Sequence, residues 1–435
     1  MKKSNKLTLY IVIAMLLGVI LGYILYRYSL QEAVRQTNEL ATTTKKVIAA
    51  SDISQPWADK LKLLTTIFLH LIQMIISPLV FTTLTVGIAK LGDLKSVGRV
   101  GGKAMLWFFS ASLISLLIGM LLVNISQPGH GINLGNPNIE DAKGIIGKTH
   151  EFSLTTFIDH VFPKSVIEAM ATNEILQIVI FSIFFGVALA AIGEKGKSVV
   201  KALDAVAHVI LKMVGYVMNF APLGVFGAIA AVIAVQGLDV FVFYGKYLLF
   251  FTIAILTLWL VLLFVGWLVL RNRLPPLLRR IVQPMVIAFS TTSSEAVFPK
   301  LTEELEGFGC KDKIVSFVLP LGYSFNLDGS MINMTFASLA IAQAYSVHLD
   351  FGTQITMLLV LMLTSKGIAG VPRASLVVVA ATCGMFKIPV EGIALLLPID
   401  HFCDMLRSTT NVLGNALATS AVSKWEGELA PEVKG

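Results

Sequence analysis

Residues 281–298 read IVQPMVIAFSTTSSEAVF, and this stretch decides how the chain can fold. Its polar centre, Ser290 to Glu295, leaves nine residues before it and three after it within the stretch, too few on either side to cross a bilayer. Basic residues flank it, Arg280 before and Lys300 after, so both ends are expected on the cytoplasmic side. Because non-helical backbone at membrane depth must be buried in protein or line a wet cavity, the stretch predicts a re-entrant helical hairpin.

A second stretch has the same build. An apolar approach from Ile355 to Leu363 leads to the tip TSKGIAGVP at 364–372, and an apolar return follows to Cys383. This hairpin is expected to enter from the opposite face. Each tip is followed, about 35 to 40 residues later, by a membrane helix that carries Asp and Asn. The two halves therefore predict an inverted-topology repeat, in which transporters place the substrate between broken helices near the midplane.

The composition places the whole chain in lipid. Of its 435 residues, 55% are hydrophobic and 14% charged, and the mean hydropathy is +0.78. Roughly 20 apolar residues make one crossing, so about eight to ten crossings fit and no large soluble module does. Lys2, Lys3 and Lys6 precede an apolar run over 7–26 without a cleavage site, which predicts a first span rather than a removed signal peptide.

Other function classes find little support. The net charge of +7 fits basic cytoplasmic loops, so we expect no nucleic-acid partner. Cys310, Cys383 and Cys403 are scattered, and the seven histidines form no H-x-x-x-H pair, so neither a disulfide framework, a metal site nor a cofactor is expected. Asp328 and Asp404 in neighbouring helices would suit an intramembrane aspartyl protease, but its Gly-x-Gly-Asp motif is missing. A channel remains the other alternative.

The last apolar helix carries a polar stripe. Its members are spaced by 4, 3, 4 and 4 residues and therefore share one helical face: Asp400, Asp404, Arg407, Asn411 and Asn415. Ionisable groups in a membrane are costly, so they normally face a cavity or a partner. Arg407 could hold a carboxylate bidentately, Asp404 an ammonium group and Asn411 a second carboxylate. The alternative is that Asp404 and Arg407 only neutralise each other.

The preceding helix is predicted to break. Prolines and glycines interrupt membrane helices, and the freed carbonyls with nearby polar side chains make an oxygen-rich site for a small hard cation. The residues concerned are Pro320, Gly322, Ser324, Asn326, Asp328, Gly329 and Ser330. The alternative is a plain proline kink with a satisfied Asp. At the first hairpin tip, Ser293 and Ser294 could cap half-helices whose N-termini favour anions.

Four ordered motifs together resemble the dicarboxylate/amino acid:cation symporter family, the glutamate transporter fold. They are Ser293-Ser294 in a Ser/Thr-rich tip, Asn326-Leu327-Asp328-Gly329, the tip from Gly367 to Pro372, and Asp404-x-x-Arg407-x-x-x-Asn411. The match covers essentially the whole chain and is closest in pattern to the bacterial proton-coupled glutamate/aspartate branch.

The resemblance implies an all-α integral membrane protein with eight transmembrane helices, two re-entrant hairpins and inverted repeats. It also implies a homotrimer in the inner (plasma) membrane, with both termini cytoplasmic, that works by an elevator mechanism and is not an enzyme. Scaffold helices would occupy 1–97 and 125–236. The transport domain would comprise the third helix at 98–124 and a core at 237–435.

The resemblance also implies roles for individual residues. Arg407 would bind the side-chain carboxylate, Asp404 the amino group and Asn411 the α-carboxylate of the substrate. The pocket would be completed by Ser293, Ser294, Ser330, Val371 and Ser408. The cation sites would use Gly322, Ser324, Asn326, Asp328, Ser365, Asn411, Asn415 and Ser112, with sodium possible at Asn326, Asp328 and Asn411.

The chain departs from the family pattern at the cation sites. Asn415 stands where an Asp is usual, Phe108 and Ala111 stand where Tyr and Thr are usual, and Glu295 replaces a Ser of sodium-coupled members. These changes favour protons over sodium as the coupling ion, with Glu295, Asp328 or Asp404 as carriers. Because Asp404 suits an ammonium group, glutamate or aspartate is the expected substrate, and C4-dicarboxylates (succinate, fumarate, malate) are the alternative. Regions 28–57 and 125–165 receive no interpretation.

Overall fold

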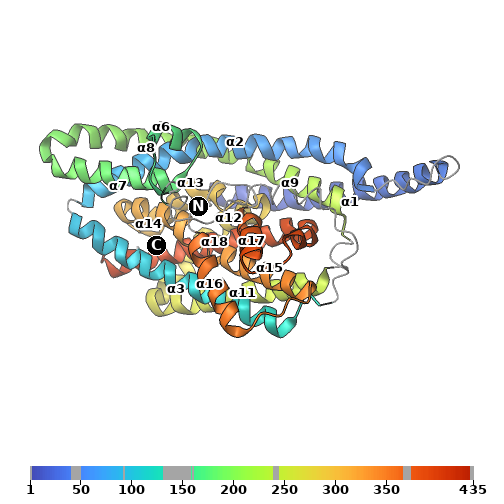
Figure 1. The fold of residues 1–435 in the computed structure, drawn as a ribbon. Helices are drawn as coiled ribbons and strands as arrows, with labels where there is room; N and C mark the ends of the chain where they lie inside the picture. Colours follow the sequence, from blue (N-terminus) through green and yellow to red (C-terminus); the bar gives the residue numbers. More distant parts are fainter. Residues whose placement is uncertain are drawn as a thin grey trace.

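The computed structural model describes residues 2–40, 50–91, 94–130, 158, 161–238, 244–365 and 374–431. These residues are almost entirely helical, with one isolated bridge between Cys310 and Leu429 and no β-strand within the described ranges (Figure 1). Within these ranges, five helical stretches are long and apolar enough to span a bilayer: Leu9–Asn38, Ile53–Lys90, Lys95–Ser126, Gly193–Val235 and Gly245–Thr291. The chain is thus a multi-pass helical protein. The total of eight helices and two hairpins stays a prediction.

Long helices from the first half form one group. They run along the upper edge of the molecule in Figure 1, and α9 packs against both α1 and α2. The group consists of α1 (Lys2–Leu40), α2 (Ala50–Leu91), α6 (Val166–Ala171), α7 (Ile175–Ala191), α8 (Lys197–Val217) and α9 (Ala221–Gln236). Short 3₁₀ turns join α7 to α8 (Gly193–Gly196) and α8 to α9 (Met218–Phe220).

The second group surrounds α18 (Leu397–Trp425), against which α11, α12, α14 and α15 all pack. Because α18 is enclosed on several sides, most of its residues after Asp404 are buried. The other members are α3 (Leu94–Ser126), α11 (Gly245–Leu270), α12 (Leu274–Thr291), α13 (Phe298–Phe308), α14 (Asp312–Phe325), α15 (Asp328–Ala344), α16 (Phe351–Thr364) and α17 (Ala374–Met385). The 3₁₀ turns Arg271–Arg273 and Val390–Leu395 precede α12 and α18.

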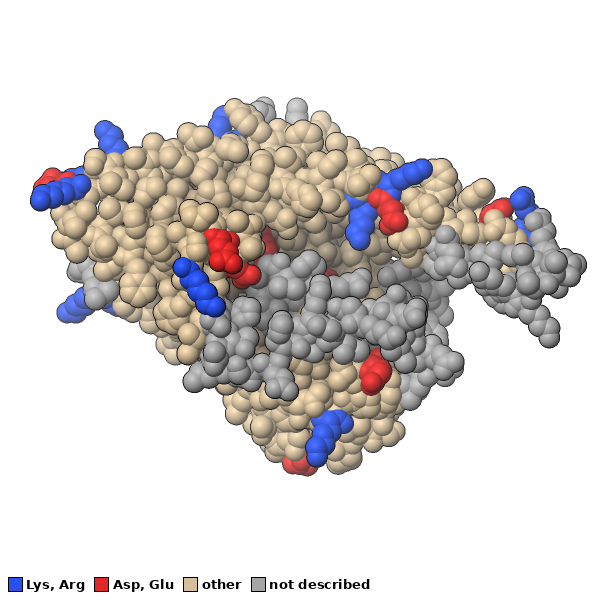
Figure 2. Space-filling view, turned by 45° about the horizontal axis from the view of Figure 1, so that its top comes forward, with Lys and Arg blue, Asp and Glu red and all other residues tan. Residues whose placement is uncertain are grey.

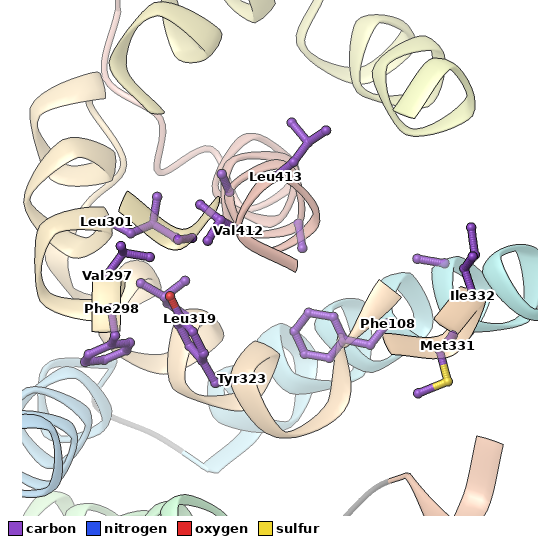
Figure 3. Close-up of a cluster of buried hydrophobic side chains, with 14 of the residues drawn as sticks. Phe108, Val297, Phe298, Leu301, Leu319, Tyr323, Met331, Ile332, Val412 and Leu413 are labelled. Atoms are coloured by element: carbon purple, nitrogen blue, oxygen red, sulfur yellow. The ribbon is translucent and has the colours of Figure 1, made fainter. Parts of the chain in front are cut away.

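Hydrocarbon side chains hold the second group together and also cover much of the outside. In the core, Val412 of α18 points toward Leu301 of α13, and Leu319 of α14 lies close by (Figure 3). Outside, the face in Figure 2 has a broad band with few charged side chains. Large apolar side chains such as Leu16 and Leu260 are exposed, at 56% and 70%. A surface of this kind is stable only when lipid or another apolar partner covers it.

The polar centre of 281–298 forms a tight turn between two packed helices. Helix α12 ends at Thr291, and Thr292 takes a left-handed conformation (φ 55°) that reverses the chain. A single 3₁₀ turn at Glu295–Val297 then leads into α13, which packs back against α12. This is the helix–turn–helix shape that the sequence predicts. In the second hairpin, α16 packs against α17, and the tip residues 366–373 lie outside the described residues.

Charged groups connect the two helix groups at one end of the molecule. Lys90 of α2 lies 2.9 Å from Asp204 of α8 and 2.9 Å from Asp312 of α14. Nearby, burial and the charge of Asp312 raise the pKa of Glu306, in α13, from 4.5 to about 7. The folded protein therefore holds a proton on Glu306 that the unfolded chain releases at lower pH.

We expect Glu306→Gln to raise the melting temperature at pH 8 by about 1–3 °C and to leave it nearly unchanged at pH 5. The folded-state pKa lies above the unfolded one, so wild-type stability falls as pH rises from about 4.5 to 7 and stays reduced above that. Glutamine is neutral throughout and avoids the loss. Thermal unfolding of the detergent-solubilised protein checks this, with the exposed Glu303→Gln as control. Equal shifts of Glu306→Gln at both pH values would contradict it.

Candidate functional site

The helix that the sequence predicts to break is interrupted at Asn326 and Leu327. Helix α14 ends at Phe325 and α15 begins at Asp328. The two residues between have non-helical backbone angles, φ −112° and ψ 63° at Asn326 and φ −97° and ψ 58° at Leu327. The break exposes the first N–H groups of α15, and the N–H of Gly329 donates to Asn411 Oδ1 of α18 over 2.9 Å. The interrupted backbone is thus directed at the polar stripe of α18.

Arg407 is oriented by groups from three helices. Its Nε lies 2.8 Å from Asp404 Oδ1, an ion pair at an angle outside hydrogen-bond geometry. Its Nη1 donates to Ser330 Oγ of α15 over 3.3 Å and to Ser375 Oγ of α17 over 3.0 Å. Within the described ranges, Nη2 makes no hydrogen bond or ion pair.

The site around Arg407 is nearly closed. The side chains of Arg407 and Asp404 keep only 15% and 12% of their accessible surface. A guanidinium presents a fork of N–H donors that matches a carboxylate, and here the Nη2 edge of the fork is still available. This arrangement can bind one carboxylate group of a small solute in a largely water-excluded position.

Asn411 joins α18 to the start of α15. Its Nδ2 donates to Ser330 Oγ over 3.3 Å, while its Oδ1 accepts from the backbone of Gly329. Both ends of the amide are therefore engaged in this structure. A ligand that accepted a hydrogen bond from Asn411 Nδ2, as the family resemblance implies, would replace Ser330 Oγ as the acceptor.

A second polar cluster lies at the break, one turn further along α18. Asn326 Nδ2 donates to Asn415 Oδ1 over 3.1 Å. Asp328 is fully buried, and its carboxylate approaches Gly414 so closely that a Cβ added there would collide with Oδ2. The cluster offers amide oxygens and a single carboxylate. In the described part of the chain, no three His, Cys, Asp or Glu side chains gather closely enough to hold a metal ion.

The helix α3 borders this cluster. Phe108 lies between α14 and α15 (Figure 3), and its Cζ is 3.6 Å from a Cβ built at Gly322. Ser112 and Ala111 are buried on the same helix. An apolar ring therefore stands next to the cation-site candidates.

The other predicted site residues are more loosely connected to Arg407. At the first tip, Ser293 Oγ accepts from the N–H of Ala296, and the carbonyl of Ser294 accepts from Val297, so their hydrogen bonds within the described residues are local. The hydroxyl of Ser365 bonds its own helix at Met362. Of the remaining members, Ser324 and Ser408 are buried, Glu295 is partly buried, and Val371 lies outside the described residues.

Sequence reasoning missed two residues of the site. Ser375 contacts the guanidinium of Arg407, and Gly414 makes room for Asp328. Both had a weak signal in the sequence. Ser375 stands three residues after Pro372, in the first turn of the return arm, and Gly414 lies between the two stripe residues Asn411 and Asn415.

Comparison with known proteins gives matches over most of the chain. Residues 7–425 match the sodium:dicarboxylate symporter family. The chain is 43% identical over 376 residues to a C4-dicarboxylate transport protein of Rhizobium etli, covering 85% of this chain and 84% of that protein. A C4-dicarboxylate transport protein of Rhodospirillum rubrum is also 43% identical, with 85% and 83% covered. A proton/sodium-glutamate symport protein of Geobacillus stearothermophilus is 39% identical, with 84% and 88% covered.

Proposed function

Because the chain belongs to the sodium:dicarboxylate symporter family, whose members are membrane transporters and not enzymes, we propose that it moves small dicarboxylates across the membrane in symport with cations. The observation that carries the proposal is the orientation of Arg407. Its guanidinium is fixed between the broken helix and the second hairpin, and its Nη2 edge has no partner among the described residues. A guanidinium that is held in direction and keeps one edge of its N–H fork open is suited to bind the carboxylate of a visiting anion.

C4-dicarboxylates are the proposed substrates. The two C4-dicarboxylate transport proteins compared above are somewhat more similar to the chain than the glutamate symport protein, at 43% against 39% identity. The preference for acidic amino acids rested on Asp404 needing an ammonium partner. In this structure Asp404 already pairs with Arg407 Nε, so its presence is explained without an ammonium group.

Acidic amino acids are the second candidate, favoured by one specific observation. The carboxylate of Asp404 lies beside the guanidinium and keeps 12% of its side-chain surface, so it could also accept an ammonium group from a bound substrate. Charge counting separates the candidates. Arg407 and Asp404 cancel, so succinate leaves two uncompensated negative charges in the site, whereas glutamate leaves one.

Asp404→Ser distinguishes the two substrates. If C4-dicarboxylates are the substrates, unlabelled succinate should inhibit uptake of labelled succinate by the variant at least as strongly as by wild type, because no ammonium contact is lost and one negative charge leaves the site. An ammonium group that lost its carboxylate partner would weaken glutamate binding about tenfold to a hundredfold. Competition assays in proteoliposomes measure both, and Asp404→Asn separates the effect of charge from that of shape. Strong wild-type inhibition by glutamate that Asp404→Ser removes would overturn the C4 assignment.

We propose protons as the coupling ion, with sodium at Asn326, Asp328 and Asn411 as the alternative. Two of the amide oxygens expected at a sodium site already accept hydrogen bonds, Asn415 Oδ1 from Asn326 and Asn411 Oδ1 from Gly329. The carboxylate of Asp328 is then the single charged ligand at the break. One such ligand gives a hard cation little compensation for the water that it loses on binding. Asp328, Asp404 and Glu295 are the proposed proton carriers.

The two helix groups suggest how transport occurs. We propose that α1, α2 and α6 to α9 are the scaffold of a homotrimer, and that α3 and α11 to α18 move as one body that carries the site. Between them, an apolar cavity of about 550 Å³ separates α1 and α9 from α11 and α18, bordered by Met15, Val19, Ile233, Phe289 and Met405. Apolar contacts are non-directional, so such a boundary can slide at low cost. N- and C-termini are proposed to lie in the cytoplasm.

A further inference from the structure

We propose that Ser375 is a positioning residue that fixes Arg407 for substrate binding and ties the return arm of the second hairpin to the site. This inference rests on the proposed function, because it assigns a residue of the same site. Ser375 is the second residue of α17, and its side chain is 1% exposed. Its Oγ accepts a hydrogen bond from Arg407 Nη1 over 3.0 Å.

The three partners of Arg407 differ in what they attach it to. Asp404 lies on the same helix, one turn away, and Ser330 lies on α15, which packs directly against α18. Ser375 is the partner that comes from the hairpin. The Arg407–Ser375 bond is therefore the contact that any displacement of α17 from the site must break.

The chemistry of the partners suits a site for a substrate anion. On the Nη1 edge, two neutral hydroxyls orient the guanidinium by accepting its N–H groups, and they add no negative charge. Carboxylates in their place would add negative charge beyond that of Asp404 and repel a substrate anion. Ser375 thus fixes the direction of the guanidinium without adding negative charge beside it, which reduces the ordering cost of binding.

Binding and hairpin position are linked as a consequence. When α17 packs against the site, it orients Arg407 and thereby favours binding of a carboxylate. By linkage, a bound carboxylate favours the packed position of α17 by the same factor. Loss of the serine hydroxyl should therefore weaken substrate binding and loosen the start of α17 together. A serine that only fills space would give neither effect.

The test compares Ser375→Ala, Ser375→Thr and Thr382→Val in the full chain. Thr382 is a matched control, since it is buried on the same helix and its hydroxyl bonds no group within the described ranges. In proteoliposomes, Ser375→Ala should raise the KM for labelled succinate about tenfold with kcat within about twofold. Ser375→Thr, which keeps the hydroxyl, should return KM to within about threefold of wild type, and Thr382→Val should match wild type. An unchanged KM in Ser375→Ala, or an equal rise in Thr382→Val, would overturn the inference.

Amide hydrogen exchange makes the test independent of transport. Without substrate, Ser375→Ala should speed exchange in the first turns of α17, and Thr382→Val should not. If the wild type transported no dicarboxylate, the proposed function would fail, while the exchange result would still report on the Arg407 contact. Equal exchange in wild type and Ser375→Ala would refute the tie between hairpin and site even if uptake were normal.

Discussion

Replacing Arg407 by alanine is expected to abolish saturable uptake of dicarboxylates. The variant loses the guanidinium fork that receives the substrate carboxylate, and it leaves Asp404 without its 2.8 Å partner. Truncating one partner of a buried, hydrogen-bonded charge pair between a protein and its ligand costs about 2–5 kcal/mol of binding, equivalent to a loss of about thirtyfold or more in affinity. Initial rates of labelled succinate uptake over a range of concentrations measure the effect.

Arg407→Lys is the matched variant for that experiment. Lysine keeps the charge but lacks the planar fork, so it cannot hold Ser330 and Ser375 with one edge and present a second edge to a carboxylate. It should retain weak uptake with a strongly raised KM. Melting temperatures of both variants establish that they fold. Uptake by folded Arg407→Ala within about threefold of wild type would show that the substrate carboxylate binds elsewhere.

The second large effect is expected for Gly414→Ala. The new Cβ would collide with the carboxylate of Asp328 and come within 3.1 Å of Asn326 Nδ2, so the two buried polar groups at the helix break must move. Overpacking of this kind costs about 1–3 kcal/mol, and here the strain falls on the proposed coupling cluster. Uptake driven by an ion gradient should fall more than about tenfold, because the displaced polar groups no longer hold the coupling ion in the correct position.

Gly215→Ala is the control for that substitution. A Cβ at Gly215, on α8, meets nothing within 4 Å, so the same chemical change is made without crowding. Uptake by this variant should equal that of wild type. Wild-type uptake by Gly414→Ala, measured in the same proteoliposomes, would show that the close approach of α18 to Asp328 has no part in transport.

Local signals in the sequence predicted the interruptions of the helices well. The polar run at 290–295 and the segment from Pro320 to Gly329 interrupt the helical backbone at their own positions. The structure accordingly turns at Thr292 and breaks at Asn326 and Leu327. Helix periodicity also placed Arg407, Asn411 and Asn415 on one face, and all three contact α15, α14 or the break between them.

What could not be predicted depends on which helices meet. Ser375 matters because α17 brings its hydroxyl to Arg407, and Gly414 matters because α18 crosses the break at Asp328. Neither crossing leaves a periodic pattern in the chain. The helices α1 and α2 also extend into the polar region at 28–57, reaching Leu40 and starting from Ala50, since a long helix can continue beyond the apolar layer. Most of 125–165 lies outside the described residues.

The choice of substrate shows the same limit. From the sequence, Asp404 could pair with an ammonium group or with Arg407, and spacing alone does not distinguish them. The structure places it 2.8 Å from Arg407 Nε, which supports the second alternative. The similarity to C4-dicarboxylate transport proteins points the same way.

The central claim is that a solute carboxylate visits the Arg407 site and is carried with a cation. Uptake of labelled succinate and labelled glutamate into proteoliposomes, under proton and sodium gradients imposed separately, tests it most directly. We expect saturable accumulation of succinate above the outside concentration when an inward proton gradient is present, and none in Arg407→Ala. Flux that never exceeds equilibrium under either gradient, or that does not saturate and persists in Arg407→Ala, would contradict it.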